Sequence, residues 1–322
     1  MGDAMRLLPL GELIDRMLEE YRQTGGIFEL HKDSWYRKGD RRSMPVFGEA
    51  CETPLGPAAG PHTQLAQNIA TSYLAGSRFM ELKTVQILDA LEIEKPCIDA
   101  ADEGYNTEWS TELTLDEAWE EYAKAWVLLH LVEELFDLKV SDLDRSFIFN
   151  MSVGYDLKGI TTEPMQRYIS RMKDSSKEEK FQGWIAEARA TAEKLEGSGL
   201  EEKAEALRSL QIPGTICTTM TLSTMHGCPP AEIESICEHM LSEQKLDTFV
   251  KLNPTLLGYD FVRETLDGLG FDYVTLSHDS FDHDLQYPDA IAILTRLRKL
   301  AAEEGRRFGV KLSNTLPTVN DQ

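Results

Sequence analysis

Three lysines lie inside or directly after short apolar stretches, where a charged side chain is costly unless it is paired or binds a ligand. Lys83 and Thr84 lie near the end of the stretch Phe79–Val85. Lys251 and Lys311 interrupt two further stretches near the end of the chain. A lysine at a strand end in a barrel mouth could stabilise negative charge on a ligand such as a reduced flavin. The simpler alternative for Lys83 is an ordinary surface lysine.

Cys228 is a second candidate, because it stands two residues after His226 and just before a predicted helix. Pro229 and Pro230 suit the first helical turn, and the helix dipole is expected to favour the thiolate of Cys228. The cysteine and the histidine could therefore serve as general acid and general base. A Cys/His hydrolase is a rival interpretation of the same residues, and a tight turn around a buried thiol is the plainest one.

Small residues and amide side chains suit a flat ligand at other places. The small residues of Thr53–Gly60 would let such a ligand lie against the backbone, although a simple Gly/Pro turn explains them too. Asn253 follows one lysine-containing stretch, and the pair Asn314 and Thr315 follows another. An amide both donates and accepts hydrogen bonds, which suits the edge of a planar, amide-like substrate.

The segment His278–Asp284 is rich in side chains that can bind metals. It lacks the spacing of a recognisable metal site, and the chain has no zincin or P-loop motif. We therefore predict no metal site here and expect a solvated loop.

Alternating strand and helix patterns surround these residues. Short stretches rich in apolar, β-branched and aromatic residues predict strands at 53–59, 79–85, 147–153, 216–223, 249–253, 273–276 and 308–312. Helical periodicity predicts helices at 8–24, 115–137, 177–210, 230–244, 259–268 and 286–304.

This alternation indicates an α/β protein with a parallel sheet covered on both faces. A (β/α)₈ TIM barrel fits better than a doubly wound sheet, because no G-x-G-x-x-G follows the first strand. We expect an extension at 1–45 and a barrel at 46–322 with helical insertions at about 100–145 and 160–212. With fewer than eight predicted strands, the barrel would be incomplete before its last strand or strands.

Composition excludes several classes of protein. The 322 residues include 55 acidic and 33 basic side chains, so the net charge of −22 argues against nucleic-acid binding. No apolar run is long enough to span a membrane, and the N-terminus lacks a signal-peptide pattern. The five cysteines form no CxxC pair, which argues against a zinc or iron–sulfur site in this chain and favours reduced thiols in the cytoplasm. We expect the four other than Cys228 to be buried apolar residues.

In this order, the motifs resemble the flavin-binding barrel of the dihydroorotate and dihydropyrimidine dehydrogenase superfamily. The resemblance rests on Pro54–Ala59, Lys83-Thr84, Phe147–Tyr155, Thr221–Thr224, Lys251–Pro254 and Asn314-Thr315. Over nearly its whole length the chain is similar to the N-terminal part of YgfK-type selenate reductase subunits. That similarity is carried by Gly56–Asn68, Glu81–Asp89, Asn106–Thr111, Leu222–Pro230 and Phe249–Gly258.

The resemblance implies an FMN site. It places Ala59, Gly60, Lys83 and Thr84 near the cofactor, together with a lysine that is either Lys251 or Lys311. It assigns the substrate face to Asn150, Ser223, Asn253, Asn314 and Thr315, and it makes Cys228 the proton donor. FAD, NAD(P) and 4Fe-4S clusters are implied only for the rest of a longer protein, and the Gly-Gly strand that grips the flavin phosphate should lie beyond residue 322.

The sequence therefore predicts the flavin-barrel portion of an iron–sulfur flavoprotein oxidoreductase, inactive as an isolated piece. Hydride or electron transfer would link the flavin to a small, possibly N-heterocyclic substrate, with the iron–sulfur and FAD portion as redox partner. Two alternatives stay open at this point. One is a non-catalytic scaffold or docking subunit with a degenerate flavin site, and the other is the Cys/His hydrolase.

Overall fold

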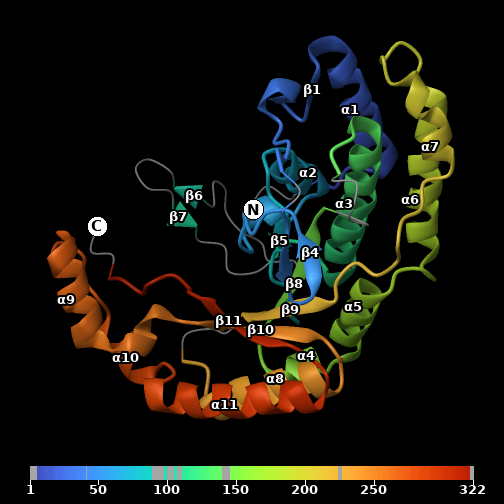
Figure 1. Cartoon of the computed structure of the whole chain (residues 1–322). Coiled ribbons are helices and arrows are strands. Elements are labelled where there is room, and N and C mark those ends of the chain that lie inside the picture. Colours follow the sequence, from blue (N-terminus) through green and yellow to red (C-terminus); the bar gives the residue numbers. More distant parts are fainter. Residues whose placement is uncertain are drawn as a thin grey trace. The chain divides into compact units, whose positions relative to one another are not determined.

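The computed structural model describes residues 6–40, 42–88, 98–99, 105–106, 111–139, 146–223 and 227–319. The chain divides into two compact units (Figure 1). The first comprises Met1–Ser152 and Thr162–Thr218, and the second comprises Val153–Thr161 and Thr219–Gln322. Among the described residues, no helix is both long and apolar enough to cross a membrane.

The long helix α3 (Leu115–Phe136) is the centre of the first unit. Its start is fixed by a capping box, in which the N–H of Glu117 donates to the Thr114 hydroxyl and the N–H of Thr114 donates to the Glu117 carboxylate. Trp119 and Trp126 are fully buried along it. The helices that contact it are α1 (Leu10–Thr24), α2 (Ala66–Leu74), α5 (Glu163–Lys173), α6 (Glu179–Ala190) and α7 (Ala204–Arg208).

The helix predictions at 8–24, 115–137 and 177–210 are confirmed in outline, whereas α2 and α5 were not predicted. The buried side chains of α5 are Met165, Tyr168, Ile169 and Met172, which follow the i, i+3, i+4, i+7 pattern of an amphipathic helix. Periodicity therefore contained the signal for α5.

Two parallel strands in the first unit position several candidate residues. β5 (Phe79–Glu81) pairs with β8 (Ile148–Gly154), whose last two residues belong to the second unit. Glu81 is in register with Asn150, so their side chains share one face. Past the end of β5, the N–H of Leu82 donates to the carbonyl of Asn150 at 3.0 Å, which continues the pairing.

The predicted strand at 53–59 is wrong, because this segment is a loop beside β5. The N–H of Phe79 donates to the carbonyl of Leu55 at 3.0 Å, and that of Glu81 donates to the carbonyl of Pro57 at 3.2 Å. Proline has no N–H, so the segment accepts hydrogen bonds from β5 without returning a full ladder.

Three two-stranded antiparallel hairpins also belong to the first unit. They are β1 (Gly26–Ile27) with β2 (Leu30–His31), β3 (Met44–Val46) with β4 (Glu49–Cys51), and β6 (Ile98–Asp99) with β7 (Tyr105–Asn106). Short 3₁₀ turns complete it at Lys32–Ser34, Pro61–Thr63, Thr191–Lys194 and Glu201–Lys203.

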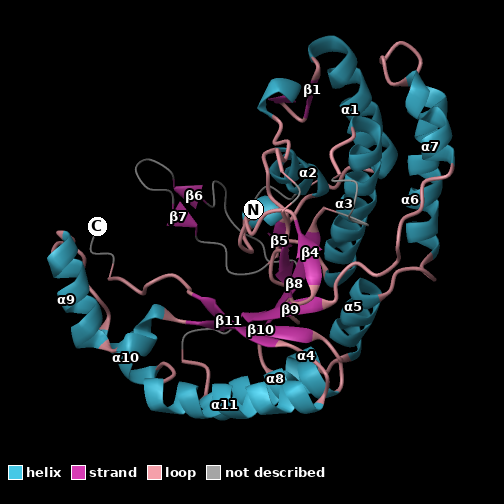
Figure 2. Cartoon of the chain, in the orientation of Figure 1, coloured by secondary structure: helices cyan, strands magenta, loops and turns pink. Residues whose placement is uncertain are grey.

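The second unit contains three parallel strands in the order β11–β10–β9. They are β9 (Thr219–Ser223), β10 (Asp247–Leu252) and β11 (Phe308–Leu312). The helices α8 (Pro230–Ser242) and α11 (Tyr287–Glu303) pack on each other and on these strands (Figure 2). Four shorter elements complete the unit: α4 (Leu157–Ile160), the turn Pro254–Leu257, α9 (Tyr259–Leu269) and α10 (His278–His283).

Alternation along β10 separates its two faces. Val250 and Leu252 are buried, whereas Lys251 between them is only partly buried. Lys251 is in parallel register with Lys311 of β11. The two lysines therefore lie on the same face of the strands.

Two predictions for the second unit are wrong. Residues 273–276 form no strand: Tyr273 is 70% exposed, and Leu276 makes only an isolated bridge with Thr318. The segment 278–284 is not a solvated loop but contains the helix α10. The Ser277 side chain caps α10, and Phe281 anchors it in a small apolar core. The five other predicted strands are present, most with shifted ends.

Candidate active site

Lys83 and Thr84 directly follow β5 in the first unit and are 3% and 9% exposed. The hydroxyl of Tyr122, on α3, donates to the carbonyl of Lys83 at 2.9 Å and so fixes the backbone there. The hydroxyl oxygens of Thr84 and Ser152 lie 2.8 Å apart. Lys83 is thus a buried cation at the C-terminal end of a strand, and the surface-lysine alternative is wrong.

Ala59 and Gly60 end the loop that runs beside β5. The N–H of Ala59 donates to Oε2 of Glu81 at 3.1 Å, and the N–H of Gly60 donates to Oγ1 of Thr63 at 3.2 Å. Because both amides are occupied, these residues offer a flat backbone surface rather than free donors. The exposed ring of His62 covers Gly60, since a Cβ at Gly60 would lie 2.5 Å from Cε1 of His62. A flat ligand over Gly60 requires this ring to turn away.

Asn150 lies on β8 and is fully buried. Its side chain shares a face with Glu81. The predicted contact of Asn150 with a substrate stays a prediction.

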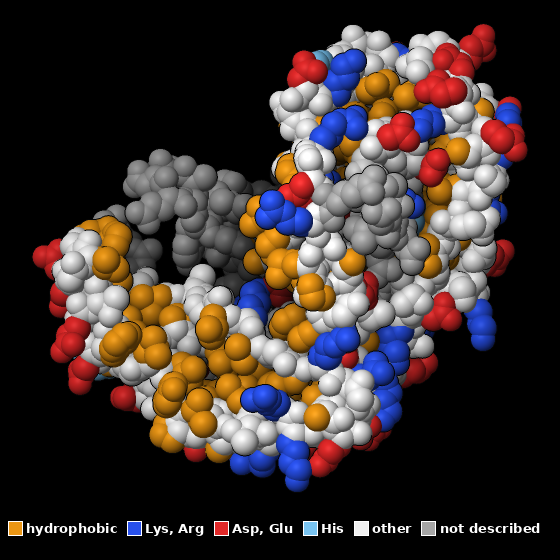
Figure 3. Space-filling model, viewed as in Figure 1, with side chains coloured by type: hydrophobic (Ala, Val, Ile, Leu, Met, Phe, Trp, Pro, Cys, Tyr) orange, Lys and Arg blue, Asp and Glu red, His pale blue; other side chains and the backbone are white. Residues whose placement is uncertain are grey.

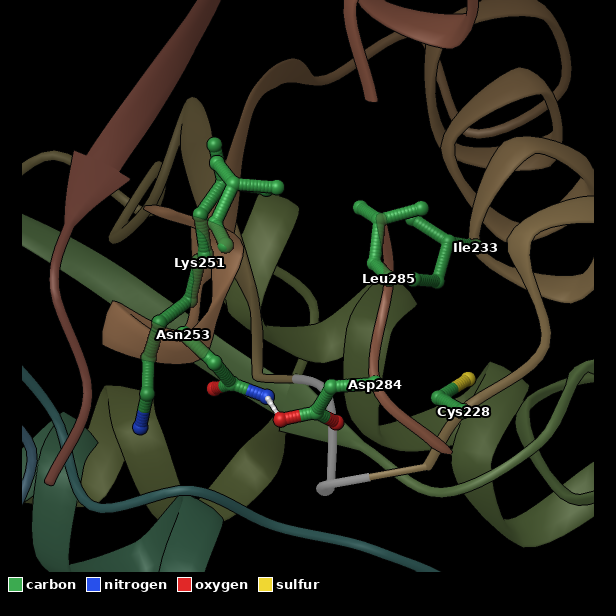
Figure 4. Close-up of a pocket in the computed structure, with 8 residues that line it drawn as sticks. Cys228, Ile233, Lys251, Asn253, Asp284 and Leu285 are labelled. Carbon is green, nitrogen blue, oxygen red and sulfur yellow. Dashed lines mark hydrogen bonds between the residues drawn. The ribbon is translucent and has the colours of Figure 1, made fainter. Parts of the chain in front are cut away.

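The second unit contains a small pocket whose walls come from separate elements (Figure 4). Cys228 precedes α8, Lys251 lies in β10, Asn253 follows β10, and Asp284 follows α10. Ile233 of α8 adds an apolar wall. The pocket thus combines a thiol, an amide, a carboxylate and an amine.

Lys251 and Lys311 lie next to each other on one face of the sheet. Nζ of Lys251 donates to the hydroxyl of Ser223, at the end of β9, over 3.4 Å. Three of the predicted residues are therefore brought together on neighbouring strands. Which lysine would contact a flavin stays open.

The amide side chains form a chain of hydrogen bonds that ends on Asp284. Nδ2 of Asn253 donates to Oδ2 of Asp284 at 3.2 Å, and the hydroxyl of Thr255 donates to the same oxygen at 2.7 Å. Nδ2 of Asn314 donates to Oδ1 of Asn253 at 3.0 Å. Oδ1 of Asn314 accepts from the N–H of Thr315 at 2.9 Å. The structure thus joins Asn253, Asn314 and Thr315, and their predicted contact with a substrate stays a prediction.

Asp284 also holds the loop of Cys228, because Oδ1 of Asp284 accepts from the N–H of Gly227 at 2.5 Å. Burial raises the pKa of the Cys228 thiol to about 11, and the carboxylates of Glu232, Asp156 and Asp284 act in the same direction. The prediction that the helix would favour the thiolate is wrong. Desolvation and three nearby negative charges outweigh the dipole, so Cys228 is a protonated thiol at neutral pH.

Sequence reasoning missed Asp284 and Thr255. Both are buried, at 6% and 4% exposure. Asp284 belongs to the acidic, histidine-rich segment, but its spacing to Asn253 in sequence carried no signal of their contact. Within the described ranges, no group of three His, Cys, Asp or Glu side chains could hold a metal ion. His226 lies outside the described residues, so its predicted pairing with Cys228 is untested. Cys97 also lies outside them, and Cys51, Cys217 and Cys237 are buried as predicted.

Comparison with known proteins assigns the chain to a family. The model of the family described as "Oxidoreductase YgfK, N-terminal TIM-barrel domain" matches residues 28–322. The chain belongs to this family. Its α/β elements and its parallel strands agree with the TIM-barrel class of the YgfK N-terminal domains.

Two curated relatives come from Escherichia coli strain K12 and Escherichia coli O157:H7, and both are provisionally named oxidoreductase YgfK. Each is 56% identical to the chain over an alignment that covers 100% of the chain and 32% of the relative. The chain thus spans about a third of the length of these proteins.

A solved structure, a ligand-free DHODH from Eimeria tenella, is 15% identical with a TM-score of 0.41. The match covers 93% of the chain and 82% of that structure. A TM-score this low does not by itself indicate a shared fold.

Proposed function

We propose that this YgfK-type domain is the flavin-binding, substrate-reducing or substrate-oxidising part of a longer oxidoreductase. The observation that carries the proposal is a pocket lined by the thiol of Cys228, by Lys251 and by Asn253, which is hydrogen-bonded to Asn314. Burial raises the pKa of this thiol to about 11, as a proton donor requires. A flavin supplies or accepts the hydride in such chemistry, and the accompanying proton needs a separate donor. Membership in a family described by an oxidoreductase name supports the same class of reaction.

The residues of the first unit fit FMN by their chemistry. Lys83 is a buried cation at a strand end, suited to negative charge at the pyrimidine end of a flavin. Ala59 and Gly60 offer a surface without a large side chain, on the condition that His62 turns aside. Thr84, held by Ser152, completes the predicted cofactor set.

The residues of the second unit fit the substrate side. Cys228 holds a proton at Sγ and passes it to the substrate atom that becomes basic during reduction, or takes a proton back in the reverse direction. Asn253 and Asn314 orient the substrate by hydrogen bonds. Thr315 is hydrogen-bonded to Asn314, Ser223 is hydrogen-bonded to Lys251, and both complete the predicted substrate set. Lys251 and Lys311 place two cations on one face of the strands of this unit.

The raised pKa of Cys228 weighs against the hydrolase alternative. A cysteine nucleophile reacts as the thiolate, and one with a pKa of about 11 is almost entirely protonated at neutral pH. A proton donor, in contrast, must hold its proton. The thiol of Cys228 is therefore better suited to acid catalysis than to nucleophilic attack.

The longer protein would supply the electrons. The chain spans about a third of the length of its curated relatives. We propose that FAD, NAD(P) and iron–sulfur clusters bind to the other two thirds of such a longer protein. The substrate is a small molecule, and selenate and N-heterocycles are both candidates.

Purified full-length protein tests the proposal through its visible flavin spectrum and its affinity for added FMN. We expect bound flavin, and we expect Lys83→Ala to weaken FMN binding by about 10- to 100-fold, because a charge-assisted contact is lost. Lys180→Ala is the matched control, since Lys180 is an exposed lysine of α6 that pairs with Glu120. A folded full-length protein that binds no FMN would overturn the proposal and favour the scaffold alternative.

A further inference from the structure

Asp284 is the only one of the residues at the second-unit pocket described above that can accept but cannot donate hydrogen bonds while ionised. It is 6% exposed and accepts from Gly227, Asn253 and Thr255. Three donors directed at one buried carboxylate stabilise its ionised form. Each polar group that contacts this carboxylate must therefore turn a hydrogen-bond donor toward it.

The orientation of Asn253 in turn fixes the orientation of Asn314. Because Asp284 only accepts, Asn253 must turn Nδ2 toward it (Figure 4). This leaves Oδ1 of Asn253 facing Asn314. Asn314 must then turn its own Nδ2 toward that oxygen. Oδ1 of Asn314 points back to Thr315 and accepts from its N–H. One carboxylate thus fixes which way both amides point.

The remaining hydrogen-bonding capacity of the pair is set by the same logic. Each Nδ2 has two N–H groups, and only one of each is used by the contacts with Asp284 and Asn253. Oδ1 of Asn314 already accepts from both the N–H and the hydroxyl of Thr315, whereas Oδ1 of Asn253 accepts from Asn314 and keeps one lone pair. Asn253 and Asn314 are partly exposed, so their second N–H groups can reach a ligand.

We propose that Asp284 is a positioning residue that makes the Asn253–Asn314 pair a hydrogen-bond donor toward ligand, so that the pocket selects a substrate edge carrying carbonyl, carboxylate or other acceptor oxygens. This proposal rests on the proposed function, because that function is what makes the pocket a substrate site. It narrows the substrate class, because a ring edge that presents N–H groups meets only one remaining acceptor lone pair on this amide pair, whereas an acceptor edge meets two remaining N–H donors. Lys251 of β10 also lines the pocket, and its ammonium group likewise favours acceptor oxygens.

Two neutral probes of similar shape test this polarity. Pyridine N-oxide presents an acceptor oxygen, and aniline presents N–H donors, so they differ in hydrogen-bond direction without a difference in charge. The readout is the NMR shift of the side-chain amides of Asn253 and Asn314 in the ¹⁵N-labelled 322-residue chain. Asn253→Asp and Asn314→Asp identify these signals. In the unsubstituted chain we expect a shift with pyridine N-oxide and at least about a tenfold weaker response to aniline.

Asp284→Asn removes the acceptor-only group while keeping its shape. An asparagine at this place can donate as well as accept, so both amides become free to turn, and we expect the preference between the probes to fall below about twofold. Asp279→Asn is the matched control. It removes the same charge from an exposed carboxylate of α10 that faces His283, and we expect it to keep the preference.

Equal responses to the two probes in the unsubstituted chain, or no response to pyridine N-oxide, would overturn the proposal even if Asp284→Asn does not fold. Retention of the preference in folded Asp284→Asn would overturn it as well. The test needs no flavin and no turnover. Failure of the flavin proposal would therefore be seen separately, in the FMN titration of the full-length protein.

Discussion

At the scale of single residues, the protonation of Cys228 decides between chemistries. A cysteine just before a helix suggests a thiolate, yet burial and three carboxylates reverse that expectation. Lys83 shows the opposite case, since the apolar stretch around it already favoured a strand-end position over the surface-lysine alternative, and Lys83 is 3% exposed. Residue type and neighbouring sequence are informative about Lys83 because its burial is local to one strand end. They are uninformative about Cys228 because its burial and two of its three carboxylates, Asp156 and Asp284, depend on distant parts of the chain.

Alkylation of Cys228 by iodoacetamide should follow its raised pKa. Since only the thiolate reacts, we expect the rate to rise about tenfold per pH unit and to level off only near pH 11, whereas a thiol at its usual value levels off near 9.0. Mass spectrometry of the modified peptide gives the rate, with Cys228→Ser marking the signal.

Removal of one of the three carboxylates near Cys228 should shift the pH profile of its alkylation to lower pH. Among the three carboxylates, Glu232 contributes most to the raised pKa of Cys228, so Glu232→Gln should lower this pKa and quicken alkylation at pH 9. Glu238→Gln, on the exposed side of α8, should leave the rate unchanged. A plateau near pH 7 in the unsubstituted chain would contradict the proton-donor role.

At the scale of elements, the loop 53–60 and β5 show why a strand-like sequence became a loop. Pro54 and Pro57 have no N–H to donate to a neighbouring strand. Gly56 lets the backbone of the loop approach β5 closely. A Cβ at Gly56 would lie 1.4 Å from the carbonyl oxygen of Phe79, which is backbone and has little freedom to move.

Gly56→Ala should therefore destabilise the protein by about 1–3 kcal/mol, and it should displace the loop that carries Ala59 and Gly60. Gly183→Ala is a matched control, because Gly183 lies inside α6 with nothing within 4 Å of the added Cβ. That change should stabilise the protein by about 0.5–1 kcal/mol. Urea unfolding measures both, and equal stability of the two variants would disprove the close approach at Gly56.

At the scale of the whole molecule, the second unit exposes apolar side chains on a strand. Val310 and Leu312 of β11 are 42% and 74% exposed, whereas their register partners Val250 and Leu252 are 1% and 5% exposed. Among the described strands β11 pairs with β10 only. Figure 3 shows hydrophobic side chains gathered on the surface of this unit. An apolar strand edge of this kind favours association with other chains.

Leu312→Lys should therefore reduce self-association of the 322-residue chain, because a charge on an edge strand opposes strand pairing. Leu269→Lys is the comparison, since Leu269 is similarly exposed, at 67%, but ends the helix α9. Sedimentation or light scattering against concentration measures the difference. An equal effect of the two substitutions would show that exposed apolar area, rather than the strand edge, drives association.

The sequence by itself determined the α/β class, five of the strands and most of the long helices, because these follow from local periodicity and from prolines and glycines at element ends. It also identified Lys83, Lys251, Asn253, Asn314 and Cys228 as candidates, since charged or amide residues beside apolar stretches are visible along the chain. Only the tertiary structure decided that Lys251 and Lys311 are in register, that Asp284 orients the amide pair, and that Cys228 keeps its proton. The first two facts depend on contacts between residues separated by tens of positions in sequence, and the third depends on burial and on the distant Asp156 and Asp284 as well as on Glu232 nearby. Burial and distant contacts are set by the packing of elements rather than by local pattern.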